Sequence, residues 1–226
     1  MARQVVASKS LVAASANNVA HSQVPLNNTP LTLNGSTVTA GVATLDTQRR
    51  ALLTYGNETA ARTMLITGTN QAGATISETL AVPATAPGTV ATVQDFYTIT
   101  SALASGGNWN AAVTLGTNGV GSTPWFVPDL WLTPTLMEIA TELAVGGTAN
   151  WTIEVTDDDP KMPLAPFQPG YNQALPICNA VGWLGLTAIS ANASAVINTP
   201  IQAWRLTINS GQSVVTAKLQ QAGLAQ

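Results

Sequence analysis

Charge is the property that this sequence has least of. Asp, Glu, Lys and Arg make up only 8% of its 226 residues, against about 25% in a typical soluble domain. Charged side chains keep a free monomer in solution and are depleted at the centres of protein interfaces, because burying them is costly. The deficit predicts that much of the surface contacts other protein rather than water.

Basic residues are also few. Eight Lys and Arg against eleven Asp and Glu give a formal net charge of −3, and the only basic cluster is Arg49-Arg50. Nucleic-acid binding requires a basic face that neutralises phosphates. We therefore expect no nucleic-acid partner.

Cysteine and long apolar runs are nearly absent. The single Cys178 excludes an intrachain disulfide framework, and its apolar neighbours predict that it is a small buried side chain. No run approaches the roughly 18 apolar residues of a transmembrane helix. Residues 1–20 lack the apolar centre of a signal peptide. We expect no membrane partner.

The catalytic inventory is poor. The one histidine, His21, stands in a polar stretch, whereas a histidine-based triad needs a buried acid and a nucleophile on rigid elements. We predict a surface position for it. No zinc-ligand spacing occurs, and residues 116–121 lack the lysine and helix of a phosphate-binding loop. The prediction is a protein that is not an enzyme, with no catalytic, cofactor-binding or metal-binding residue and no cofactor.

Carboxylates cluster at one place, Asp157-Asp158-Asp159, just before Pro160. Adjacent carboxylates at a strand end are suited to binding Ca²⁺, and a solvated turn is the simpler interpretation, so both stay open. Glu138 and Glu142 lie four residues apart and show no sign of a matched acid–base pair.

Alternation of apolar and polar residues predicts an all-β fold. It places Trp109, Trp151 and Trp204 on buried strand faces. Turn-forming residues predict hairpins at 68–73 and 209–212, and the glycines of 116–124 predict an ordered loop. The expected strands span residues 63–69, 75–82, 90–100, 109–115, 137–145, 151–155, 204–208 and 215–219.

Three parts are expected along the chain. Residues 1–30 form an extended N-terminal arm, 31–130 a first β lobe, and 131–226 a second β lobe with a proline-rich excursion at 160–176. The arm has little apolar core of its own, so another body holds it. A neighbouring subunit is the simplest holder, and docking on its own domain is the alternative.

A faint internal repeat supports two lobes. Residues 58–67 resemble 147–156, and the strand–glycine turn–strand segment 96–115 resembles 204–219. The fold class is therefore β-sandwich or jelly-roll-like, with two duplicated lobes as one architecture and a single two-sheet jelly roll as the other.

The aromatic residues between the expected lobes have three interpretations. Trp125, Phe126 and Trp131 lie in a proline-flanked stretch. They pack between the lobes, anchor a neighbouring subunit, or form a platform on which a sugar stacks.

Four segments of the sequence together form one pattern. They are Gly116-Thr117-Asn118-Gly119-Val120-Gly121-Ser122-Thr123-Pro124-Trp125 and residues 66–73, 96–101 and 205–211. This pattern resembles one that recurs in structural proteins of tailed-bacteriophage and prophage virions. The resemblance covers roughly residues 60–130 and 200–223. It implies a virion protein, located in the virion, whose partners are copies of itself and other virion proteins.

The resemblance supplies no catalytic residues and leaves the place in the particle open. The leading hypothesis is a homo-oligomeric component of the neck or tail. The alternatives are a capsid-decorating (cement) protein and a fibre module that binds a receptor or glycan. An enzyme such as a depolymerase ranks last.

Overall fold

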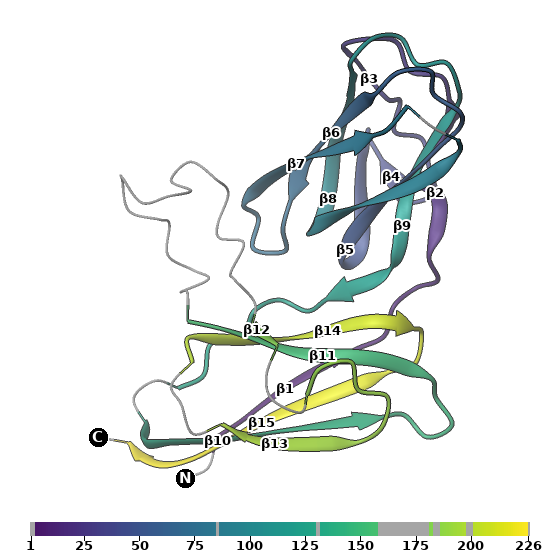
Figure 1. Cartoon of the computed structure of the whole chain (residues 1–226). Coiled ribbons are helices and arrows are strands. Elements are labelled where there is room, and N and C mark those ends of the chain that lie inside the picture. The colour runs from purple at the N-terminus through teal and green to yellow at the C-terminus, as the bar shows by residue number, and fades with distance from the viewer. Residues whose placement is uncertain are drawn as a thin grey trace, which may run out of the picture. The chain divides into compact units, whose positions relative to one another are not determined.

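The computed structural model describes residues 3–84, 86–129, 132–157, 181–182, 186–197 and 201–225. In these ranges every regular element is a β-strand, and no helix occurs. The strand pairings are antiparallel, and the sheets pack face to face in the manner of a sandwich (Figure 1). The predicted all-β class is confirmed.

Fifteen strands are described. Their bounds are β1 (Arg3–Lys9), β2 (Ser15–Gln23), β3 (Thr29–Pro30), β4 (Val38–Thr39), β5 (Val42–Tyr55), β6 (Arg62–Thr69), β7 (Thr75–Val82), β8 (Gly88–Ser105), β9 (Val113–Ser122), β10 (Leu132–Leu143), β11 (Ala149–Thr156), β12 (Val181–Gly182), β13 (Ala193–Ile197), β14 (Ala203–Gly211) and β15 (Val215–Ala225).

The chain divides into two compact units. Unit 1 consists of Met1–Val12 together with Gly119–Gln226, and unit 2 is Ala13–Asn118. This division differs from the boundaries expected at residues 30 and 130. The first strand of the expected arm belongs with the C-terminal half of the chain, and the passage between units falls inside β9.

Unit 1 has two layers. One is a four-stranded sheet in the order β1-β15-β10-β13, and the other places β11 between β12 and β14, with the end of β9 beside β14 (Figure 1). The apolar face of each sheet is turned to the other. The core between them includes the buried side chains Ile139, Trp151, Ile153, Trp204, Leu206 and Leu219.

Unit 2 is organised around two long strands. β5 pairs with β4, β8 and β9, and β8 pairs with β3, β5 and β6. The predicted hairpin at residues 68–73 is confirmed, since β6 and β7 pair from Arg62↔Val82 to Thr69↔Thr75. Buried side chains fill the interior, among them Leu53, Met64, Ile66, Phe96, Trp109 and Leu115.

The N-terminal segment docks on its own chain, which is the alternative that the sequence left open. β1 runs antiparallel to β15 through seven register pairs, from Arg3↔Gln221 to Lys9↔Val215. Its inward side chain Ala7 is buried, as is Leu11 just beyond it. β2 in turn pairs with β9. The segment expected to be an arm up to residue 30 therefore supplies an edge strand to each unit.

The predicted hairpin at residues 209–212 is wrong. β14 and β15 belong to different sheets of unit 1, so the turn carries the chain across the core instead of along one sheet. The turn around residues 105–108 likewise joins strands that are not neighbours, because β5 lies between β8 and β9. Glycines at a turn predict a reversal of the chain, but the pairing partner depends on distant strands.

The predicted loop at residues 116–124 is mostly strand, since β9 extends to Ser122. Glycine is needed there for a steric reason. A Cβ on Gly116 would overlap the backbone of Ser15 and Ala16, so the missing side chain lets β2 approach β9 closely. The glycine content of this stretch marks a close backbone contact, where the sequence suggested irregular structure.

Two apolar side chains lie on the solvent side, against the predicted alternation. Val93 is 73% exposed and Val145 is fully exposed. Val93 lies where the register between β5 and β8 shifts, and an extra residue in one strand turns the following side chains to the other face. Val145 lies beyond the end of β10, in the turn at Gly146 and Gly147.

Candidate assembly surface

His21 and Asp157, two of the residues considered for candidate chemistry, are exposed. The backbone N–H of His21 donates to Asn34 Oδ1 at 2.8 Å. The predicted surface position of His21 is confirmed. Across the described ranges, no group of three or more His, Cys, Asp and Glu side chains is placed to hold a metal ion.

Several predicted features lie outside the described residues. They are Asp158 and Asp159, Cys178, Trp131 and the proline-rich excursion 160–176. The calcium interpretation of Asp157-Asp158-Asp159 and the buried position expected for Cys178 stay predictions.

Most described charges are paired within the chain. Two of these pairs join residues three or four positions apart, and three join residues of different strands. They are Arg49–Asp46, Arg50–Asp95, Arg62–Glu58, Arg205–Glu154 and Lys218–Glu142, at nitrogen–oxygen distances of 2.5–3.6 Å. Among the described residues, ten charged side chains are therefore engaged in ion pairs within the chain.

Trp125 is engaged by a neighbouring cation. The guanidinium carbon of Arg205 lies 4.7 Å from its ring centroid, within the range of a cation–π contact. Arg205 Nε also donates to Glu154 Oε2 at 2.5 Å. One face of the Trp125 ring is thus occupied by a side chain that is itself held in place.

Phe126 belongs to the core of unit 1. Its ring is tilted against that of Trp204, with centroids 5.2 Å apart, and its backbone exchanges two hydrogen bonds with Trp204. Of the three aromatic residues expected to act together, the structure thus places Trp125 under Arg205 and Phe126 against the apolar interior.

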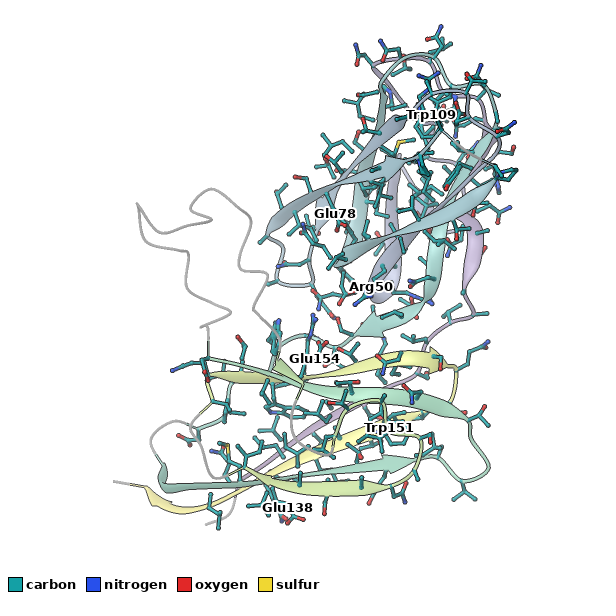
Figure 2. All side chains as sticks on the ribbon, in the orientation of Figure 1. Arg50, Glu78, Trp109, Glu138, Trp151 and Glu154 are labelled. Atoms are coloured by element: carbon teal, nitrogen blue, oxygen red, sulfur yellow. The ribbon has the colours of Figure 1, made fainter. Side chains whose placement is uncertain are left out.

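One broad face of unit 1 is exposed and mixes apolar, uncharged polar and charged side chains. The inward residues of the four-stranded sheet are buried, so their strand neighbours point away from the core. Figure 2 shows Glu138 on this side, away from Trp151. We call this surface the outer sheet face; it consists of Gln4, Val6, Ser8, Leu136, Glu138, Ala140, Glu142, Ser194, Val196, Thr216, Lys218 and Gln220.

The outer sheet face mixes apolar and uncharged polar groups. Val6, Leu136 and Val196 are 49%, 46% and 59% exposed. Of its three charged residues, Lys218 is paired with Glu142 at 2.7 Å. Each Å² of apolar surface removed from water contributes about 25 cal/mol. A face of this kind is suited to contact with another protein surface.

The edge of the same sheet is formed by β1. β15 is the only described strand that pairs with β1, so the opposite edge of β1 carries backbone groups that are not used in a ladder with the described strands. Edge strands of this kind are sites at which another chain can add a strand.

Comparison with known proteins adds no relative. No known family matches the chain, and no curated protein matches it either. In the described part of the chain, no helix has the length and apolarity needed to cross a membrane.

Proposed function

We propose that this protein is a non-enzymatic structural component of a bacteriophage virion that assembles in many copies at the neck or tail. The observation that carries the proposal is the outer sheet face, a four-stranded surface on which Val6, Leu136 and Val196 are exposed and Lys218 is paired with Glu142. The sequence resemblance to virion structural proteins gives the kind of particle. The 8% content of charged residues fits a surface that meets other subunits.

The two units are, in this proposal, duplicated lobes. In unit 1 β10 pairs with β15 and β11 pairs with β14; in unit 2 β5 pairs with β9 and β6 pairs with β8. Each unit also carries an N-terminal edge strand, β1 on β15 and β2 on β9. The order of these strands and these pairings correspond, which supports duplication over a single jelly roll, although the pairing of β5 with β8 has no counterpart between β10 and β14.

The mechanism is mechanical. Antiparallel strands with filled cores give stiff blocks, and contacts between copies join the blocks into a particle. Burial of uncharged side chains costs less desolvation than burial of ions, so low-charge faces favour such contacts without needing an exact charge match.

Two other virion roles use the same features. A capsid-decorating protein needs a similar sandwich and contact face. A glycan-binding fibre module needs an open aromatic platform, and the Arg205 contact on Trp125 leaves only one face of that ring for a sugar. The sequence resemblance points to a virion protein and leaves its place in the particle open.

The test is the composition of purified particles. Particles from a culture that carries this gene are banded on a density gradient and digested for quantitative mass spectrometry. We expect peptides of this chain in the particle band at several copies per particle. Recovery of the chain only in the soluble fraction would contradict the proposal.

Light scattering of the purified protein adds the mode of assembly. A discrete ring or trimer means that contacts between copies form unaided, and its symmetry indicates the part of the particle that it fits. A monomer means that the protein is recruited to an existing shell or tail.

A further inference from the structure

The first strand of unit 1 comes from the other end of the chain. Unit 1 is Met1–Val12 with Gly119–Gln226, and the whole of unit 2 lies between these two segments. In unit 2, by contrast, the edge strand β2 stands at the start of the same continuous segment, Ala13–Asn118. The segment Gly119–Gln226 therefore contributes no N-terminal edge strand of its own to β15.

β1 completes unit 1 through backbone and core contacts. It forms the seven register pairs with β15. Ala7 is 2% exposed and Leu11 is 4% exposed, and Val5 packs against the same core. Without this strand, the edge of β15 and part of the apolar core would be open to water, which is unfavourable for both.

No tight turn ties β1 to its partner strand. β1 and β15 are separated by 205 residues, since Lys9 and Val215 are the nearest paired ends. After the buried Leu11, the residues 12–14 are exposed and lead directly to β2 in unit 2. β1 is thus held on β15 by strand pairing and by the burial of its side chains. The same pairing and burial can form between β1 of one copy and β15 of another copy.

We propose that β1 is an exchangeable strand, which pairs with β15 of a second copy when the protein assembles, and that the structure shows the closed, intramolecular form. This inference rests on the proposed function, because it names the contact that joins the copies. Strand exchange reproduces the existing ladder in another molecule, so no new interface chemistry is needed. Repeated head-to-tail, it gives a ring or an open chain of subunits.

The occupant is a second copy because the site already fits the sequence of β1. The register places Ala7 opposite Ala217 and Val5 opposite Leu219 on the inner side of the sheet. On the outer side, Ser8 Oγ and Thr216 Oγ1 are 3.0 Å apart. A foreign strand would need small and apolar side chains at the same positions, whereas β1 of another copy supplies them by identity.

The test uses disulfide formation between two different variants. Ser8→Cys and Thr216→Cys are made separately in full-length protein that also carries Cys178→Ser. The two variants are mixed at a concentration at which light scattering detects association, and then oxidised. Because residues 8 and 216 meet only when β1 lies on β15, we expect a disulfide-linked dimer on a non-reducing gel, in at least threefold excess over either variant alone.

A matched pair controls for random collision. Ala140→Cys and Ser194→Cys lie opposite each other on the same outer sheet face, but both strands belong to the continuous segment Gly119–Gln226. Mixing these two variants should give no excess of dimer. The double variant Ser8→Cys/Thr216→Cys at high dilution should instead cross-link within one chain, which also reports that the strand has folded in place.

A competing peptide gives a second readout. Excess synthetic peptide of residues 1–12 should reduce the yield of cross-linked dimer, and the same peptide with Ala7→Asp should not, because a carboxylate cannot enter the core. No dimer from the mixture, together with an intramolecular cross-link in the double variant, would overturn the exchange. That result would not bear on the proposed function, which the composition of purified particles tests separately. Conversely, if the mixed variants cross-link but the protein is absent from particles, the proposed function is overturned and the strand exchange stands.

Discussion

The carboxylate of Glu78 holds the backbone of Gln94, with Glu78 Oε2 2.8 Å from the Gln94 nitrogen. Glu78 Oε1 also accepts the N–H of Val93 at 2.8 Å. These two amides lie where β8 changes register against β5, so they lack ladder partners on that strand. A side chain from β7 thereby satisfies the irregularity in β8, and Figure 2 marks Glu78 in unit 2.

Replacing Glu78 by alanine should therefore destabilise the protein. Two amide donors lose their acceptor, and we expect a loss of about 1–2 kcal/mol in the free energy of unfolding, measured by urea denaturation. Glu78→Gln keeps one acceptor oxygen and should lose less. Glu138→Ala is the control, since Glu138 is exposed and has no ion-pair partner among the described residues. Equal losses for Glu78→Ala and Glu138→Ala would contradict this role.

Glu58 should be the more sensitive carboxylate. Its side chain is fully buried; it accepts the N–H groups of Asn110 and Ala111 at 3.0 and 3.1 Å and lies 3.4 Å from Arg62 Nε. Glu58→Ala leaves a buried guanidinium without its counter-charge, and we expect a loss of about 3–5 kcal/mol.

The exposed pair Lys218–Glu142 provides the comparison for Glu58. Lys218→Ala should change the free energy of unfolding by about 0–1 kcal/mol, since exposed ion pairs contribute little. Urea denaturation of both variants by circular dichroism measures the difference. If Lys218→Ala costs as much as Glu58→Ala, burial is not what makes the Glu58 pairing important.

Two neighbouring glycines should respond differently to alanine. A Cβ on Gly116 meets the backbone of Ser15 and Ala16, whereas a Cβ on Gly119 has nothing within 4 Å. Gly116→Ala should push β2 away from β9 and cost about 1–3 kcal/mol, which corresponds to a lower melting temperature in a thermal scan. Gly119→Ala should leave that temperature nearly unchanged. A melting temperature for Gly116→Ala equal to that of the unchanged protein would show that β2 does not approach so closely.

A charge on the outer sheet face should affect assembly more than folding. Val196 is 59% exposed, so Val196→Asp should change the free energy of unfolding by no more than about 0.5 kcal/mol. Incorporation into particles, measured by quantitative mass spectrometry, should fall by at least tenfold. Leu26→Asp is the control in unit 2, where the side chain is likewise 59% exposed. Normal incorporation of Val196→Asp would remove the outer sheet face from the contacts between copies.

The sequence by itself determined the fold class, most strand positions and much of the core. Alternation of side chains is a local property with a period of two residues, so it correctly placed Trp109, Trp151 and Trp204 in the interior. It also predicted the β6–β7 hairpin, because those strands are adjacent in the chain and their turn is short.

Only the tertiary structure decided which strands pair. β15 lies beside β1 and β10 instead of β14. The backbone amides whose hydrogen bonds Glu78 and Glu58 accept also lie far along the chain: Val93 is 15 residues from Glu78, and Asn110 is 52 residues from Glu58. Such contacts depend on how distant strands stack, and a local pattern of residues contains no information on that stacking. Gly116 is an example. The glycine content of residues 116–124 predicted a loop, whereas Gly116 lies in strand β9, where β2 approaches it closely.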